Sequence, residues 1–362
     1  MHTVHKSTLV LFAVLLFATS CKQDPVEPTP LPVHDTTPFA FDAQGLPPPM
    51  LPADNALTVQ TIALGKRLFF DKRLSKDGSQ ACVTCHQQVD GFSDKRRFSI
   101  GVENLPGTRQ AMPLFNLAWH RRGFFWDGRA LTLRDQVLRP IQDPLEMNET
   151  LDNVVAKVSA EKTYRDQFVR AFGSDTVSSN RISLALEQFL LTMVSARTKH
   201  DAVIRGEATF TEQEERGRNL FFTEFDPSGK VKGAECFHCH GGPNFTNDQF
   251  MNNGLDAEPM FTDLGRFDVT KNDRDKARFK VPSLRNTEHT APYMHDGRFT
   301  TLEEVVRHYN TDVKRSPTTE FILQFNLQPG GLRLSEEDIA DLVVFLKTLS
   351  DPQLLTNTAF QE

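Results

Sequence analysis

The sequence predicts a mainly α-helical protein in which two tandem copies of one domain follow an export signal and a proline-rich tether. Three observations support this prediction. Apolar residues recur at helical intervals in several stretches, whereas no stretch sustains the alternation expected of β-strands. A C-x-x-C-H motif occurs at residues 82–86 and again at 236–240. Shorter motifs around it also occur once in each half, which indicates an internal repeat.

Residues 1–20 have the features of a lipoprotein signal peptide. Lys6 precedes an apolar run over residues 9–18, which is too short to be a convincing membrane span. Small residues lead directly to Cys21, so we expect Cys21 to become the lipidated N-terminus of the mature chain. An incidental thiol beside an ordinary cleavage site is the alternative. Lys22 follows in place of an aspartate, which favours a lipid-anchored protein of the outer membrane, on the periplasmic side of a bacterial envelope.

Residues 21–55 are rich in proline, which fixes φ and removes backbone donors, so they are predicted to be an extended tether. The two repeated domains are expected at residues 56–205 and 206–362, with a boundary near Gly206. Apolar periodicity predicts helices over residues 58–70, 151–172, 179–204 and 335–350. Ser335 is the expected N-cap of the last helix, because two glutamates follow it in the first turn.

The C-x-x-C-H motif is the signature of covalent haem attachment, in which two thiols bond the haem and the histidine supplies an axial nitrogen to iron. A zinc site or a thiol redox pair is the alternative. A zinc ribbon would place its two cysteine pairs roughly 15–20 residues apart, whereas these pairs lie in different halves of the chain. Cys21 is the only other cysteine, so none remains for a disulfide. We therefore predict two c-type haems, each in a cytochrome c-like domain, bound by Cys82, Cys85, His86, Cys236, Cys239 and His240.

The motifs around the two haem sites repeat in the same order. Gly65-Lys66-Arg67-Leu68-Phe69-Phe70 precedes the first motif, and Gly217-Arg218-Asn219-Leu220-Phe221-Phe222 precedes the second. An Asp-Gly-Arg sequence follows each motif, preceded by Trp126 in the first half and by His295 in the second. The chain is therefore interpreted as a duplicated haem domain whose two copies have diverged, and their differences should mark a division of labour.

On these motifs the chain resembles the bacterial di-haem cytochrome c peroxidase and MauG family, from about Ala56 to Leu349. The resemblance also includes Pro282-Ser283-Leu284-Arg285-Asn286 and the sequence from Ala291 to Gly297. It implies a peroxidatic N-terminal haem domain and a C-terminal haem domain that transfers electrons.

For haem one, the resemblance implies a distal histidine after a Ser-Ile-Gly sequence, but this chain has Val102 there. Valine cannot bind iron, so we expect an open or water-filled sixth position, with Met112 or His120 as alternative ligands. The resemblance also implies that Gln136 and Glu146 are the active-site pair. A glutamate can move a proton between the two peroxide oxygens. Without the resemblance, both side chains would be predicted to be solvated.

For haem two, the position that is a methionine ligand in typical peroxidases holds Tyr309, as in MauG. His308, Met294 and an ordinary core tyrosine are the alternatives. Trp126 matches the family's tryptophan that relays electrons between the haems, and a packed core tryptophan is its alternative. The family's calcium site, between the haems, corresponds here to Gln110, Thr290 and Pro292.

The expected function is reduction of hydrogen peroxide. The electrons would come from a small periplasmic cytochrome c or cupredoxin, or from a protein substrate that is oxidised as by MauG. A di-haem electron-transfer cytochrome without peroxidase activity, or a haem-based sensor, is the alternative. The net charge of −6 argues against a nucleic-acid partner. Family members are often dimers, so a homodimer is also expected.

Overall fold

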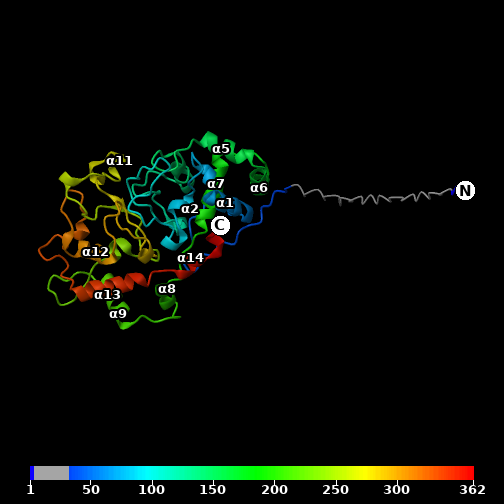
Figure 1. Ribbon diagram of the computed structural model, residues 1–362. Helices are drawn as coiled ribbons and strands as arrows, with labels where there is room; N and C mark the ends of the chain where they lie inside the picture. Colours follow the sequence, from blue (N-terminus) through cyan, green and yellow to red (C-terminus); the bar gives the residue numbers. More distant parts are fainter. Residues whose placement is uncertain (4–31) are drawn as a thin grey trace. The chain divides into compact units, whose positions relative to one another are not determined.

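The computed structural model describes residues 1–3 and 32–362. Most of the predicted signal peptide, Cys21 and the first part of the predicted tether therefore lie outside the described residues. Helices and loops make up the described part (Figure 1), which confirms the mainly helical prediction. Its strand pairing is limited to β1 (Phe250–Met251) and β2 (Phe279–Lys280), which run antiparallel. No helix in the described ranges has the length and apolarity needed to cross a membrane.

The helices of each half are short and connected by long loops. Those of the first half are α1 (Val59–Phe70), α2 (Cys82–Cys85), α3 (Leu133–Gln136), α4 (Arg139–Gln142), α5 (Leu151–Ala160), α6 (Lys162–Phe172), α7 (Ser179–Leu191) and α8 (Lys199–Ile204). Those of the second half are α9 (Glu212–Phe222), α10 (Phe237–His240), α11 (Phe267–Thr270), α12 (Leu302–Arg307), α13 (Glu336–Lys347) and α14 (Pro352–Thr356).

Two of the four predicted helices are confirmed and two prove to be pairs of helices. Thr58 caps α1, and Ser335 caps α13 by accepting the Asp338 N–H at 3.2 Å. Residues 151–172 break at Glu161, whose backbone is extended. Residues 179–204 break after α7, where the prediction of one helix was wrong.

The physical reason for the second break is that side chains from distant segments capture backbone groups. Asn116 accepts the Ser195 N–H at 2.8 Å, and Asp351 accepts the N–H groups of Ala196 and Arg197 at 3.0 Å. These N–H groups are therefore not available for the backbone hydrogen bonds that would continue the helix. Periodicity cannot reveal such long-range competition.

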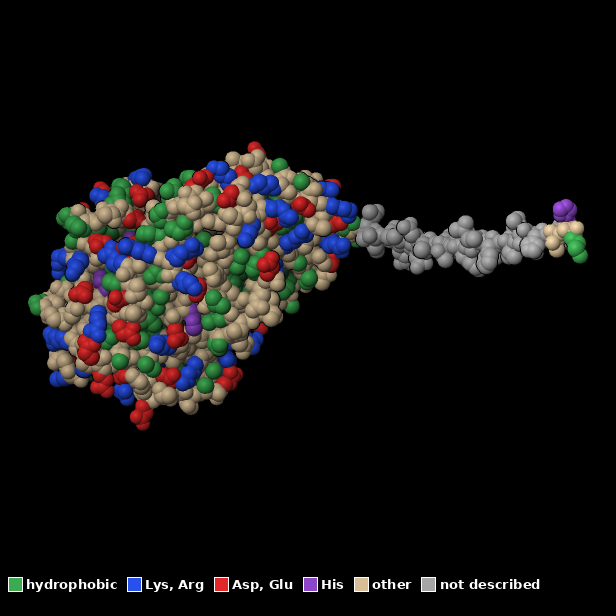
Figure 2. Space-filling view, in the orientation of Figure 1, with side chains coloured by type: hydrophobic (Ala, Val, Ile, Leu, Met, Phe, Trp, Pro, Cys, Tyr) green, Lys and Arg blue, Asp and Glu red, His purple; other side chains and the backbone are tan. Residues whose placement is uncertain are grey.

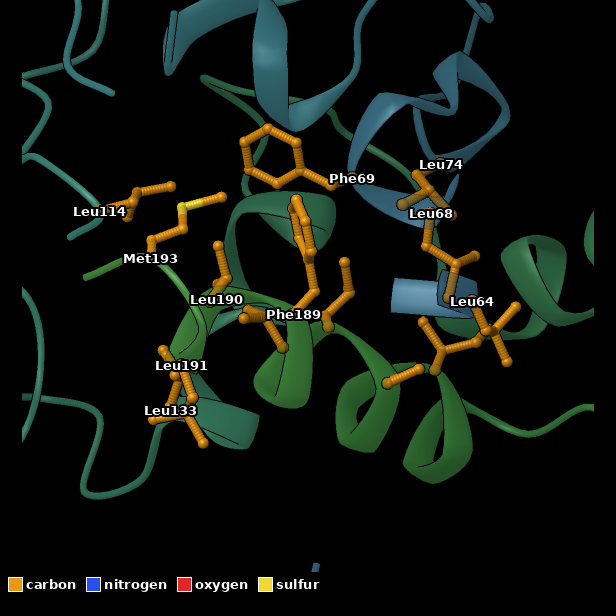
Figure 3. Close-up of a cluster of buried hydrophobic side chains, with 14 of the residues drawn as sticks. Leu64, Leu68, Phe69, Leu74, Leu114, Leu133, Phe189, Leu190, Leu191 and Met193 are labelled. Atoms are coloured by element: carbon orange, nitrogen blue, oxygen red, sulfur yellow. The ribbon is translucent and has the colours of Figure 1, made fainter. Parts of the chain in front are cut away.

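The core of the first half lies where α1 crosses α7. Figure 3 shows Leu64, Leu68 and Phe69 close to Phe189, and the Phe69 and Phe189 ring centroids are 5.4 Å apart. Gly65 allows this crossing, because a Cβ atom there would lie 1.9 Å from the Ala185 carbonyl oxygen.

The second half repeats this crossing with α9 and α13, which lie side by side in Figure 1. A Cβ atom at Gly217 would lie 1.9 Å from the Asp341 carbonyl oxygen and 2.9 Å from the Cβ of Phe345. At Gly65 the corresponding distance to the Cβ of Phe189 is also 2.9 Å. The repeated glycine therefore has the same structural role in both halves, namely close helix–helix contact.

Each half contributes a segment that packs against the other half. In α8, before Gly206, the His200 ring packs against Phe245 of the second half with centroids 4.9 Å apart. Conversely, Leu354 and Phe360 at the C-terminus join the core of the first half. Figure 1 shows α14 beside the elements of that half.

Part of the predicted tether is packed rather than extended into solvent. The Asp35 N–H donates to the Arg170 carbonyl at 2.9 Å, and the Trp119 indole donates to the Pro47 carbonyl at 2.8 Å. Leu46 is buried. From Asp35 onward, the proline-rich segment therefore belongs to the folded body. On the face shown in Figure 2, acidic and basic side chains are intermixed, and hydrophobic side chains are scattered among them.

Candidate haem sites

The first C-x-x-C-H motif forms one helical turn, α2, and ends at a histidine that the backbone orients. The His86 N–H donates to the Cys82 carbonyl at 3.0 Å. The Nδ1 of His86 lies 2.8 Å from the Phe92 carbonyl oxygen, so Nδ1 carries the proton and Nε2 keeps its lone pair for a metal. Burial lowers the pKa of His86, which favours the neutral ring that metals require.

The second motif has the same construction. In α10 the His240 N–H donates to the Cys236 carbonyl at 2.9 Å, and Nδ1 lies 3.3 Å from the Phe245 carbonyl oxygen. Burial lowers the pKa of His240 to about 4. Phe92 and Phe245 both adopt positive φ angles, 57° and 51°, so the same turn aims each carbonyl at its histidine.

A cavity, which we call cavity one, lies in front of the first motif. Two adjoining pockets share His86, Gln136 and Glu146 and together form it. Its lining also includes Cys82, Cys85, Ser99, Leu114, Leu145 and Trp126. The structure therefore brings the predicted axial histidine and the predicted active-site pair to one space, although they come from three separate segments.

Glu146 is held at the wall of cavity one by its backbone. The Val102 N–H donates to the Glu146 carbonyl at 2.8 Å. A Cβ atom at Gly101 would lie 2.2 Å from the Leu145 carbonyl oxygen, so these two segments pack closely. Burial raises the pKa of Glu146 to about 7, Asp143 adds to the rise, and Arg129 opposes it. The carboxyl group can therefore gain or lose a proton near neutral pH.

The possible sixth ligands of haem one differ in their positions. Among the described residues, Ser99, Ile100 and Gly101 line cavity one, but Val102 does not. Met112 and His120 both line it. The buried Nδ1 of His120 has no hydrogen-bond partner in the described part, and its ring stacks on Phe124 with centroids 5.7 Å apart. Both alternative ligands are therefore near the site.

The second motif faces a more apolar space, cavity two. Cys236, Cys239, His240 and Tyr309 line it together with the apolar side chains Phe221, Met251, Leu284, Leu302, Val306, Leu342 and Leu346. None of the four motif cysteines forms a disulfide with another described residue. Two thiols and one neutral imidazole at the wall of a cavity fit a covalently attached haem, so the residues of both motifs suit that cofactor.

The structure separates the candidates for the sixth ligand of haem two. Tyr309 and Met294 line cavity two, whereas the buried His308 does not, and its Nε2 lies 3.1 Å from the Asn253 carbonyl oxygen. Residues His308–Asp312 form a turn of π-helix directly after α12. The wider π-helical turn changes which side chain faces inward, and such turns occur frequently at functional sites.

Trp126 lies between the two sites, because it lines both cavities. It is 7 % exposed, and its indole N–H donates to the Gln110 carbonyl at 2.8 Å. Gln110 also lines both cavities, and its side-chain amide donates to the Ser93 hydroxyl at 2.8 Å. The position agrees with a group that links the two haem sites.

The three predicted calcium-binding residues line the same cavity. Gln110, Thr290 and Pro292 all line cavity two. The Gln110 backbone carbonyl accepts the Trp126 indole N–H, and a carbonyl oxygen has a second lone pair, so either Gln110 oxygen could bind an ion. Calcium binding stays a prediction.

Two residues of these sites were not predicted from the sequence. Asn253 donates its side-chain amide to the Tyr309 hydroxyl at 3.3 Å and to the Met294 sulfur at 3.4 Å. No local pattern identifies it, because asparagine is common in loops. Lys280 is 1 % exposed, lines both cavities and pairs with Asp248. Its place beside the apolar Phe279 and Val281 was an available signal, because buried lysines are rare.

Comparisons with known proteins agree with this geometry. The profile of the family described as di-haem cytochrome c peroxidase matches residues 59–209. The methylamine utilization protein MauG of Methylorubrum extorquens is 38% identical over 310 residues, which cover 84% of this chain and 82% of that protein. The cytochrome c551 peroxidase of Nitrosomonas europaea is 36% identical over 294 residues, 80% of each chain. Among solved structures, a MauG-like protein associated with microbial copper homeostasis matches with a TM-score of 0.79 and 34% identity, over 87% of this chain and 96% of that one.

Proposed function

Because the chain belongs to the di-haem cytochrome c peroxidase and MauG family and is an oxidoreductase of that kind, we propose that it reduces hydrogen peroxide at cavity one. The observation that carries this proposal is the convergence of His86, Gln136 and Glu146 on that cavity. Cys82 and Cys85 would hold haem one, and Cys236, Cys239 and His240 would hold haem two.

The haems would supply the redox chemistry, in which two electrons and two protons convert each peroxide into two waters. The side chains of cavity one manage the protons. Glu146 in its carboxylate form takes a proton from one peroxide oxygen and gives it to the other oxygen, which then leaves as water. Gln136 donates an N–H to the oxygen without competing for the proton.

The ligands of the two irons are proposed to differ. We infer an open sixth position at haem one, since valine occupies position 102, and Tyr309 as the sixth ligand of haem two. A phenolate is a harder donor than a thioether and stabilises higher oxidation states. Trp126 would pass electrons between the sites, a role supported by its lining of both cavities.

The physiological partner would be either a small cytochrome c or cupredoxin that donates electrons, or a protein whose side chains are oxidised. The combination of Val102 and Tyr309 favours MauG-like ligation. A periplasmic location, a lipid anchor at Cys21 and a homodimer complete the proposal. Calcium between the haems would involve Gln110, Thr290 and Pro292.

The test is an electron paramagnetic resonance spectrum of the diferric protein before and after stoichiometric hydrogen peroxide. One high-spin and one low-spin haem, with loss of the high-spin signal after peroxide, is the expected result. Glu146→Gln should slow this loss by about 10²–10⁴-fold, the usual contribution of a general base. The control Asp152→Asn, an exposed carboxylate on α5, should behave like the wild type. Two low-spin haems that ignore peroxide would instead reveal a hidden sixth ligand at haem one, as in an electron-transfer cytochrome or a peroxidase that must first be reduced.

A further inference from the structure

Three potential metal ligands meet near the surface, and one of them, Glu235, also lines cavity two. Glu224 lies just after α9, Glu235 directly precedes Cys236, and His238 lies between the two cysteines of the second motif. One ligand atom from each lies within 4.8 Å of the others. We propose that Glu224, Glu235 and His238 bind a divalent transition-metal cation, separate from both haem irons.

The backbone places these side chains by bringing two segments into close contact. The Ala234 N–H donates to the Leu220 carbonyl at 2.8 Å, and the Glu235 N–H donates to the Thr223 carbonyl at 3.1 Å. Gly233 is needed here, because a Cβ atom would lie 2.2 Å from the Glu224 carbonyl oxygen. The positions of Glu224 and Glu235 are therefore set before any ion binds.

The side chains are also partly oriented. The Nε2 of His238 lies 3.1 Å from a Glu224 carboxylate oxygen. One Glu235 oxygen accepts the Phe225 N–H at 3.0 Å, which leaves its second oxygen for a ligand bond. The Glu224 side chain is 64% exposed and that of His238 is 28% exposed, so an ion can enter from solvent. Water or an external ligand can complete its coordination.

The charges of the cluster favour a dication. Within the described residues, neither Glu224 nor Glu235 forms an ion pair with lysine or arginine. Two adjacent carboxylates repel each other, and a divalent cation between them removes that repulsion. Ligand atoms that bind one ion at about 2.0–2.2 Å lie about 3–3.5 Å from one another. Side-chain rotations that move the three ligand atoms by roughly 1 Å would therefore bring them to these distances.

The ligand types indicate which ions suit the site. An imidazole nitrogen with carboxylate oxygens suits Zn²⁺ or Cu²⁺, whereas Ca²⁺ and Mg²⁺ prefer oxygen ligands alone. Because His238 belongs to the haem-attachment turn, the ion would lie beside the covalent anchor of haem two.

The experiment is calorimetric titration of Zn²⁺ into chelator-treated holoprotein. The wild type should bind one Zn²⁺ per chain at this site. Glu224→Gln and His238→Asn should each weaken binding by about 100-fold or more, since changes outside the coordination shell alone cost about 10–100-fold. The matched control is His289→Asn. The His289 imidazole lies 3.8 Å from the Glu288 carboxylate and pairs with no second carboxylate among the described residues. This control should bind as the wild type does.

Equal Zn²⁺ affinity in the wild type and Glu224→Gln, or no binding by the wild type, would overturn the proposal. Haem content must be measured for every variant, because His238 lies inside the attachment motif. Glu224 lies outside that motif, so Glu224→Gln decides the question even if His238→Asn fails to acquire haem. The Zn²⁺ titration does not measure peroxide reduction, so the metal site and the proposed peroxidase activity are tested separately.

Discussion

Replacing Gly65 by alanine should destabilise the protein, although alanine is the better helix former. The added Cβ would lie 1.9 Å from the Ala185 carbonyl oxygen and 2.9 Å from the Cβ of Phe189. Non-bonded contacts lie near 3.5 Å, so α1 and α7 would have to separate by about 1.5 Å.

The magnitude follows from two opposing effects. Overpacking costs about 1–3 kcal/mol, and separation of the helices also loosens Leu64, Leu68 and Phe189, each at most 1% exposed. Helix propensity favours alanine over glycine by about 1 kcal/mol. We expect a net loss of about 2–3 kcal/mol in the free energy of unfolding, because removed core contacts add to the overpacking cost.

The assay is urea unfolding of the holoprotein followed by circular dichroism. Ala63→Gly, at an exposed position of α1, calibrates the propensity difference and should cost about 1 kcal/mol. Gly217→Ala should lose stability by an amount similar to Gly65→Ala, since its clash distances match. Unchanged or increased stability of Gly65→Ala would refute the argument that close packing requires glycine.

Four further predictions concern the sites and the contact between the halves. Peroxide reduction should rise with pH through about 7 as Glu146 deprotonates, and Glu146→Gln should abolish this rise in a pH–rate profile. In the folded protein the pKa of Glu146 lies above its usual 4.5, so the folded state holds this proton more tightly than the unfolded state does. The free energy of unfolding should therefore fall by about 3 kcal/mol as pH rises from 4.5 through 7, and Glu146→Gln should lack this fall. Tyr309→Phe should change the electron paramagnetic resonance signal of haem two, whereas Tyr293→Phe should not. The buried Arg285 guanidinium donates to the Asp201 carboxylate at 2.7 and 2.8 Å. Arg285→Met leaves that carboxylate without its partner and should lower the free energy of unfolding in urea by about 3–5 kcal/mol.

Controls separate these effects from general damage. The Tyr293 hydroxyl donates to the Thr287 carbonyl at 2.9 Å, so Tyr293→Phe removes a hydroxyl from the same cavity without removing the proposed ligand. Arg205→Met breaks an exposed ion pair with Glu207 and should leave stability nearly unchanged, because surface ion pairs contribute little. A Tyr309→Phe spectrum identical to the wild type would exclude Tyr309 as a ligand.

Local sequence determined the attachment chemistry and the repeat. The C-x-x-C-H motifs need only five consecutive residues, so Cys82 and His86 could be recognised without a fold. The cap at Ser335 was equally local, because a helix N-terminus depends on residues within one turn. The repeated glycines were visible as a pattern, although their reason, contact with a distant helix backbone, was not.

Tertiary structure decided what depends on packing. It ended the helix after Leu191 through Asp351, placed Trp126 between the cavities, and brought Glu224 to His238. It also turned Tyr309, rather than His308, toward cavity two through a π-helical turn. Sequence patterns report spacing along the chain, whereas burial, cavity lining and ligand clusters depend on segments far apart in the chain that pack together.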